Sequence, residues 1–241
     1  AYLAALLTLA ALSLPGAGAA QEFSFSLGDD GSITARTIQL FALITVLSLA
    51  PGLAIMVTCF PFIVTVLSIL RQAIGLQQSP PNMLIVSLAL FLSYFIMEPV
   101  FTAAWENGIA PLTEELIDVE TAFERTLAPF RGFMAARLDP DTFFAMAELR
   151  PATMDAEPTA EAPLSVLSPS FLLSEIARAF QIGFLIYLPC LIIDLVVAAI
   201  LMSMGMMMVP PAVVSLPFKL AFFVVADGWS LIAGSLVRSY F

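Results

Sequence analysis

The fold of this chain is decided by one long apolar stretch, PSFLLSEIARAFQIGFLIYLPCLIIDLVVAAILMSMGMMMVPP (residues 169–211). Ser168-Pro169 is typical of a helix start, with an N-cap residue followed by proline at the first helical position. From there the sequence stays hydrophobic to about Met204, with Pro189 inside. A helix of that length exceeds the hydrocarbon core of a bilayer, which is about 30 Å thick. We therefore expect one very long membrane-associated helix.

Three further segments have the same apolar character. They run from about Ile38 to Leu70, from about Met83 to Ala104 and from about Ala212 to Val237. Because paired prolines cannot continue a helix and the connections are short, we expect two antiparallel hairpins in an all-α fold. The hairpin-turn prolines are Pro80, Pro81, Pro210 and Pro211. Prolines inside the segments, at Pro51, Pro61, Pro99, Pro189 and Pro217, indicate four kinked helices rather than four straight ones.

The composition supports a membrane protein. Of the 241 residues, 60% are hydrophobic and 12% are charged, whereas a soluble domain has about 45–50% apolar and about 25% charged residues. This balance excludes a disordered protein and most soluble enzymes. The net charge of −10 repels phosphate backbones, so we expect no nucleic-acid partner.

Most of the negative charge lies in one polar insert. Residues 101–165 hold twelve acidic residues and four arginines, a net charge of −8. An apolar stripe with helical spacing predicts amphipathic helices there, and it consists of Leu116, Val119, Phe123, Leu127 and Phe130. Asp139-Pro140 resembles a helix cap and first turn, and we expect residues 151–168, with three prolines, to form a loop.

These features divide the chain into five segments. They are a signal peptide (1–20), a periplasmic N-terminal segment (21–37), the first hydrophobic hairpin (38–104), an acidic periplasmic helical insert and loop (105–168), and the second hydrophobic hairpin with its Met-rich loop (169–241). The signal peptide is predicted from an apolar run too short to span a bilayer, followed by small residues. Export of the N-terminus, with Arg71 and Lys219 at the inner turns, places the N-terminus, insert and C-terminus outside the cytoplasm.

Nothing in the sequence indicates catalysis. Histidine is absent, which excludes the HExxH zinc site and the Ser-His-Asp triad. The glycine-rich phosphate-binding motifs and the nucleophile elbow are missing as well. Cys59 and Cys190 both lie in apolar runs, where we expect packing residues rather than a metal site. We expect neither an enzyme nor a cofactor.

Charged residues within the apolar segments are the candidate functional residues, because charges at membrane depth are costly. Glu175 and Arg178 are three residues apart and can pair on one helix face. Asp194 needs a partner, a water-filled cavity or a position outside the bilayer, and Lys219 is the obvious cation, from the same chain or a neighbour. One interpretation is structural pairing between helices. The alternative is a proton-coupled small-solute transporter that uses Asp194 and Glu175.

The second candidate site is a methionine cluster. Met206, Met207 and Met208 follow one another between Gly205 and Pro210, outside any helical periodicity. They are either an apolar packing turn or a flexible seal, because thioether side chains repack around varied contacts.

Several strings carry a family resemblance. They are VLSILRQAIGLQQSPPNMLIVSLALFLSYFIMEPVF (66–101), AFQIGF (179–184), LIIDLV (191–196), MGMMMVPP (204–211), LPFKL (216–220) and DGW (227–229). In these strings the chain resembles the flagellar FliP family and its virulence-secretion counterparts. The resemblance covers most of the chain outside the predicted signal and the acidic insert.

The resemblance implies a pore-forming subunit of the type III protein export gate in the bacterial inner membrane, at the flagellar basal body. Five copies are expected to assemble helically with FliQ and FliR, next to FlhA and FlhB, and to pass unfolded flagellar proteins. It also implies that Met206, Met207 and Met208 form a gasket that closes the pore. Glu175 and Lys219 match charged positions that bridge neighbouring subunits.

Overall fold

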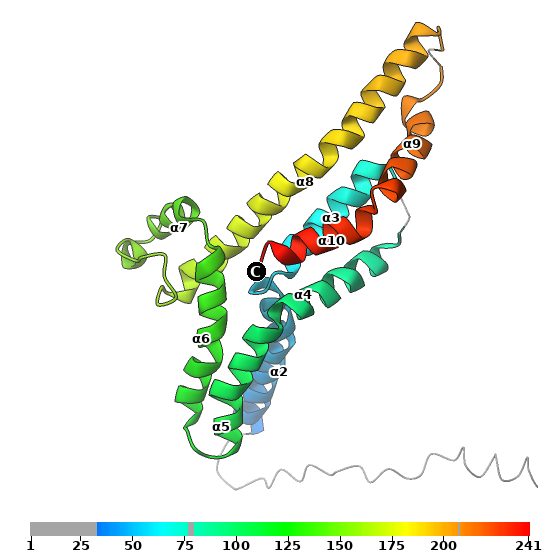
Figure 1. Ribbon diagram of the computed structural model, residues 1–241. Coiled ribbons are helices and arrows are strands. Elements are labelled where there is room, and N and C mark those ends of the chain that lie inside the picture. Colours follow the sequence, from blue (N-terminus) through cyan, green and yellow to red (C-terminus); the bar gives the residue numbers. More distant parts are fainter. Residues whose placement is uncertain (1–32, 77–79, 207) are drawn as a thin grey trace, which may run out of the picture. The chain divides into compact units, whose positions relative to one another are not determined.

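The computed structural model describes residues 33–76, 80–206 and 208–241, so the predicted signal peptide lies outside the described residues. In these ranges every regular element is a helix, which confirms the all-α prediction (Figure 1). The elements are α2 (Ile33–Met56), α3 (Phe60–Ile74), α4 (Asn82–Ala104), the π-helix η1 (Trp105–Ile109), α5 (Ala110–Thr113), α6 (Val119–Arg137), α7 (Pro140–Ala147), the 3-10 helix η2 (Pro151–Thr153), α8 (Leu164–Ser203), α9 (Pro211–Val225) and α10 (Gly228–Arg238). The chain divides into two units after Ser48, and the second unit is Leu49–Phe241.

The long helix α8 contains 40 residues and includes Pro189 without ending there (Figure 1). It begins at Leu164, so the predicted start at Ser168-Pro169 is wrong. Pro163 is the N-cap, and its carbonyl accepts hydrogen bonds from the N–H groups of Val166 and Leu167 at 3.0 Å each. Both of those side chains are buried in a hydrophobic cluster, so packing extends the helix into the stretch expected to be loop.

The first and the fourth apolar segments are broken helices rather than single kinked ones. In the first, α2 ends at Met56 and α3 begins at Phe60, while Pro51 lies within α2 and Pro61 in the first turn of α3. At the break the Thr58 hydroxyl donates to the carbonyl of Ile55 at 2.7 Å. A side-chain bond of this kind competes with the helical ladder.

In the fourth segment α9 and α10 meet at an angle of 61°. The break is at Ala226 and Asp227, and Asp227 has a left-handed backbone with φ of +47°. An added Cβ at Gly228 would lie 2.2 Å from the ring of Phe223, so a glycine is needed at this bend. Pro217 lies inside α9 and does not break it.

Two hydrophobic clusters hold the second unit together. The larger is built around the buried face of α3 and takes residues from α4, α8 and α10, among them Phe62, Leu67, Ala89, Met97, Ala179 and Leu236. In this cluster α8 approaches α3 closely at Gly183, where an added Cβ would lie 2.4 Å from Cδ1 of Ile69. Burial of this kind contributes about 25 cal/mol per Å² of apolar surface and is the main stabilising term.

The smaller cluster joins the insert to the beginning of α8. Its fully buried members Phe143, Leu167 and Phe171 come from α7 and α8. The predicted cap at Asp139-Pro140 is confirmed, because the Asp139 carboxylate accepts the backbone N–H of Thr142 at 3.0 Å. The insert therefore folds as helices α6 and α7 held against α8.

Two described helical segments are long and apolar enough to cross a membrane, Asn82–Thr113 and Leu164–Ser203. The bent pair α9 and α10 makes a third candidate if it is counted as one span. Helix α3 is apolar but contains only 15 residues, fewer than the roughly 20 that a span needs. Two to three candidate spans therefore take the place of the four long hydrophobic helices that we expected.

Candidate functional site

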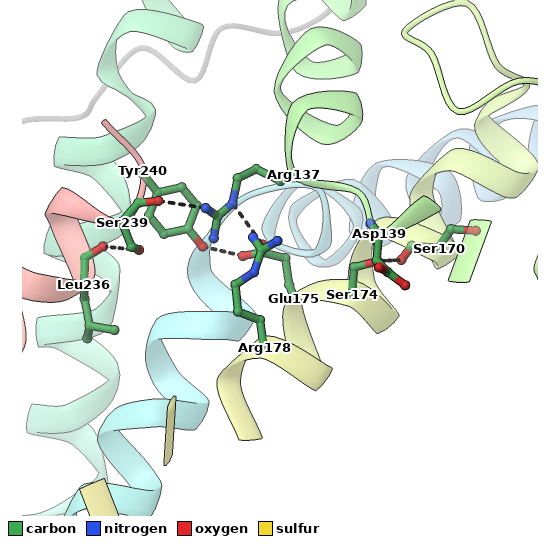
Figure 2. Close-up of polar contacts among 9 residues, drawn as sticks. All are labelled: Arg137, Asp139, Ser170, Ser174, Glu175, Arg178, Leu236, Ser239 and Tyr240. Carbon is green, nitrogen blue, oxygen red and sulfur yellow. Dashed lines mark hydrogen bonds and ion pairs between the residues drawn. The ribbon is translucent and has the colours of Figure 1, made fainter. Parts of the chain in front are cut away.

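A buried carboxylate on α8 is the centre of the first polar cluster. The Glu175 side chain has no exposed surface. Its Oε1 lies 3.2 Å from Nε of Arg137 and 3.4 Å from Nη1 of Arg178, and its Oε2 accepts the hydroxyl of Tyr240 (Figure 2). A buried charge is tolerated only when it is paired and hydrogen-bonded. Three donors from three parts of the chain meet this need.

Arg137 connects the insert to the end of the chain. It is the last residue of α6, and its Nη1 donates to the backbone carbonyl of Ser239 at 2.7 Å (Figure 2). Its guanidinium carbon lies 4.0 Å from the ring centroid of Tyr240, within the range of a cation–π interaction. Arg137 therefore holds the end of α6, the first third of α8 and the C-terminal residues together.

Aromatic rings surround this cluster. Tyr240 makes an edge-to-face contact with Phe62 at 5.6 Å between ring centroids and stacks on Phe133 at 6.0 Å. Next to it, the backbone N–H of Asp139 donates to the hydroxyl of Ser174 at 3.0 Å, which in turn donates to the carbonyl of Ser170 at 2.7 Å (Figure 2). These contacts fix the start of α7 against α8 and remove water from the Glu175 carboxylate.

The second polar cluster lies near the other end of α8. Lys219 on α9 places Nζ 2.6 Å from Oδ2 of Asp194, and the hydroxyl of Ser215 donates to Oδ1 at 2.5 Å. Nζ of Lys219 also donates to the carbonyl of Ala73 at 3.2 Å. Because the Lys219 side chain is almost fully buried, this group of contacts joins α8, α9 and the end of α3.

The structure therefore brings Glu175 to Arg178 and Asp194 to Lys219, both within one chain. Sequence reasoning missed two partners of Glu175, namely Arg137 and Tyr240. Arg137 is 38 residues away from Glu175 and Tyr240 is 65 residues away, so no helical spacing relates them. Near Glu175, the sequence offers only Arg178 at helical spacing. A glutamate in an apolar helix with a single local cation was the one sequence signal that a distant partner exists.

The methionine turn follows the end of α8 directly. Gly205 is left-handed with φ of +74°. The N–H of Met206 donates to the carbonyl of Leu201 and the N–H of Gly205 to that of Met202, the two bonds of a Schellman motif. The Met208 side chain is 97% exposed and that of Met206 is 42% exposed, while Met207 lies outside the described residues. The turn thus presents thioether side chains away from the helix core.

Three of the four turn prolines stand at helix starts, and Pro80 lies in the turn before them. Pro81 is the N-cap of α4 and Pro210 that of α9, and Pro211 opens α9. Arg71 stabilises the proline turn between α3 and α4, since its Nη1 donates to the carbonyl of Pro80 at 3.4 Å and to Oδ1 of Asn82.

The described residues contain no group of three or more His, Cys, Asp or Glu side chains suited to a metal ion. Cys59 and Cys190 are free and buried. Glu175 and Asp194 lie 19 residues apart on α8, which is about 28 Å at 1.5 Å per residue. They belong to separate clusters, each with its own cation, which does not favour the transporter alternative in which the two act together.

Long apolar helices, charges paired between helices and an exposed methionine turn define a helical membrane protein. A sequence model of the FliP family matches residues 43–236, and the chain belongs to this family. The flagellar biosynthetic protein FliP of Caulobacter vibrioides is 48% identical over 241 residues, which cover all of this chain and 90% of that protein. The protein of the same name from Agrobacterium fabrum is 48% identical over 98% of both chains. That of Bacillus subtilis is 43% identical over 90% of this chain and 97% of its own.

Proposed function

We propose that this chain is the core pore-forming subunit of the flagellar type III protein export gate, and that it passes unfolded flagellar proteins across the inner membrane. Membership of the FliP family supports the flagellar role. The observation that carries the pore is the methionine turn, because a Schellman motif ends α8 at this point and both Met206 and Met208 are exposed. In this proposal the flexible thioether side chains of Met206, Met207 and Met208 form a gasket. The gasket closes the empty pore and fits around a chain that passes through it.

The exposed apolar surface supports an assembly of several subunits. One face of α8 leaves large side chains more than half exposed, including Phe180, Phe184, Leu185, Ile192 and Leu195. Such a surface is covered either by lipid or by protein. In the proposed gate, other copies of this chain, FliQ and FliR cover part of it, with FlhA and FlhB as further components.

The polar contacts support one orientation. The Arg137–Ser239 bond holds the end of α6, within the insert, next to the C-terminal residues, which supports a position of the insert and the C-terminus on the same side of the membrane. The Lys219–Ala73 bond puts the middle of α9 next to the end of α3, close in sequence to Arg71. In our proposal the insert, the N-terminus and the C-terminus are periplasmic, and the two proline turns are cytoplasmic, where basic residues are favoured.

Co-purification tests this proposal. The tagged chain is extracted from its own cells in mild detergent, and the mass and composition of the particle are determined by native mass spectrometry. We expect several copies of this chain together with FliQ and FliR. A monomer that carries neither partner contradicts the proposal.

A further inference from the structure

A deep apolar groove in the second unit has no role in the contacts described above. It has a volume of about 970 Å³, at the upper end of the range for ligand pockets, about 300–1,000 Å³. Its walls come from the end of α2, the second half of α4, α6 and the beginning of α8. Among the lining side chains are Phe91, Tyr94, Phe101, Phe123, Leu127 and Leu172. The groove thus runs between α6 and the two candidate spans that contain α4 and α8.

Among the described residues, Arg131 of α6 is the only charged side chain that lines the groove. Its Nη1 donates to the carbonyls of Ala160 and Ala162 at 3.2 and 3.1 Å, which fixes the guanidinium at the loop before α8. A guanidinium has five N–H donors, and those on Nε and Nη2 of Arg131 make no hydrogen bond within the part of the chain that the structure describes. No carboxylate in that part lies within ion-pair distance of Arg131, although Glu161 is close in sequence.

The beginning of α8 adds a second attraction for an anion at the same place. Leu164, its first residue, lines the groove together with Arg131. The N-cap is Pro163, which makes no side-chain hydrogen bond to the first turn. In the first turn of α8 the N–H groups of Val166 and Leu167 already donate to the Pro163 carbonyl, so the attraction comes from the positive end of the helix dipole. An anionic group beside Arg131 would therefore meet both a guanidinium and the start of a 40-residue helix.

From this arrangement we infer that the groove binds an anionic phospholipid. The acyl chains lie along the aromatic and aliphatic wall formed by α4, α6 and α8, and the phosphate lies at the mouth, against Arg131 and the first turn of α8. A lipid fits better than a second copy of the chain because the groove combines an apolar wall with a cation that has no carboxylate partner among the described residues. That pattern is the complement of an anionic amphiphile. The site goes beyond the proposed export function and does not depend on it.

The test compares two lipids with the same acyl chains. The full chain is purified in detergent, stripped of lipid, and titrated with phosphatidylglycerol or phosphatidylcholine while native mass spectrometry counts the bound lipid. We expect the wild type to prefer phosphatidylglycerol. In Arg131→Gln the affinity for phosphatidylglycerol falls about tenfold and that for phosphatidylcholine does not change, because a charge-assisted hydrogen bond is lost. In Arg125→Gln, an exposed arginine of the same helix outside this groove, neither affinity changes.

A second pair of variants tests the apolar wall. Leu172→Trp fills the groove and lowers the binding of both lipids, whereas Leu173→Trp, whose side chain does not line the groove, leaves both unchanged. If Arg131→Gln fails to fold, Arg131→Lys replaces it and is expected to keep the preference for phosphatidylglycerol. Equal affinities of the wild type for the two lipids overturn the proposal. So does a Leu172→Trp variant that dissociates the particle into single chains without a change in bound lipid, since the groove would then be an interface between subunits.

Discussion

Nε of Arg137 lies 3.2 Å from Oε1 of Glu175, and through this contact the end of α6 is attached to the first third of α8. The same guanidinium holds the backbone of Ser239 and covers the ring of Tyr240. One side chain thus connects the insert, the longest helix and the end of the chain. Because the carboxylate is fully buried, the stability of this region depends on its partner cation.

Replacement of Arg137 tests this dependence. We expect Arg137→Ala to lower the free energy of unfolding by about 3 kcal/mol, because it leaves a buried carboxylate with weaker compensation. The measurement is chemical unfolding in detergent followed by circular dichroism. Arg150→Ala, an exposed arginine of the same insert, should change the value by no more than about 0.5 kcal/mol. Equal effects of the two variants would show that Glu175 does not need Arg137.

A double-mutant cycle tests the contact of Asp194 with Lys219. Asp194→Asn and Lys219→Met each leave one polar group at the α8–α9 contact without its charged partner. We expect the double variant to be less destabilised than the sum of the two single variants by about 1–3 kcal/mol, as is usual for residues in direct contact. Additive effects would mean that the two charges do not interact in the folded chain.

The close approach of α8 to α3 gives a third prediction. Gly183→Ala would place Cβ 2.4 Å from Cδ1 of Ile69, and we expect a loss of about 1–3 kcal/mol in unfolding free energy from overpacking. Gly132→Ala is the matched control, since a Cβ there meets no atom within 4 Å. It should stabilise α6 by about 0.5–1 kcal/mol. The second substitution Ile69→Ala should rescue Gly183→Ala, and failure to do so would contradict the proposed clash.

The cap of α7 predicts a pH dependence. Hydrogen bonds from the Thr142 side chain and N–H hold the pKa of Asp139 below its ordinary value of 3.8. A carboxyl group with a lowered pKa stabilises the fold above its unfolded pKa, and this contribution is lost as the pH falls through the folded pKa. Between about pH 5 and pH 2 the wild type should therefore lose more stability than Asp139→Asn, which caps without a charge. Parallel unfolding curves for the two chains would contradict this.

The sequence predicted those features that depend on neighbouring residues. Asp139 and Pro140 form a local cap, and the spacing of Glu175 and Arg178 indicates a pair on one helix face. It did not predict contacts between distant residues, such as that of Arg137 with Glu175. The start of α8 at Leu164 was missed for a related reason. Val166 and Leu167 become helical because they are buried against the insert, and this tertiary effect outweighs the local signal of Ser168-Pro169.

The break between α2 and α3 illustrates the same limit. Pro51 and Pro61 drew attention to two possible kinks, but Pro51 stays within α2. The chain leaves the helix between them, next to Thr58, whose hydroxyl bonds to a backbone carbonyl. Threonine has this ability in many helices that do not break, so the residue alone does not identify the position.

The permeability of the closed gate tests the central proposal most directly. The complex of this chain with FliQ and FliR is reconstituted in vesicles, and the leakage of a small trapped ion is measured without substrate. We expect the wild type to retain the ion, and a triple variant with alanine at Met206, Met207 and Met208 to leak, because the thioether seal is gone. Alanine at Met202 and Met204, which precede the turn, should leave the vesicles tight. A triple variant as tight as the wild type would contradict the proposal that this turn closes a pore.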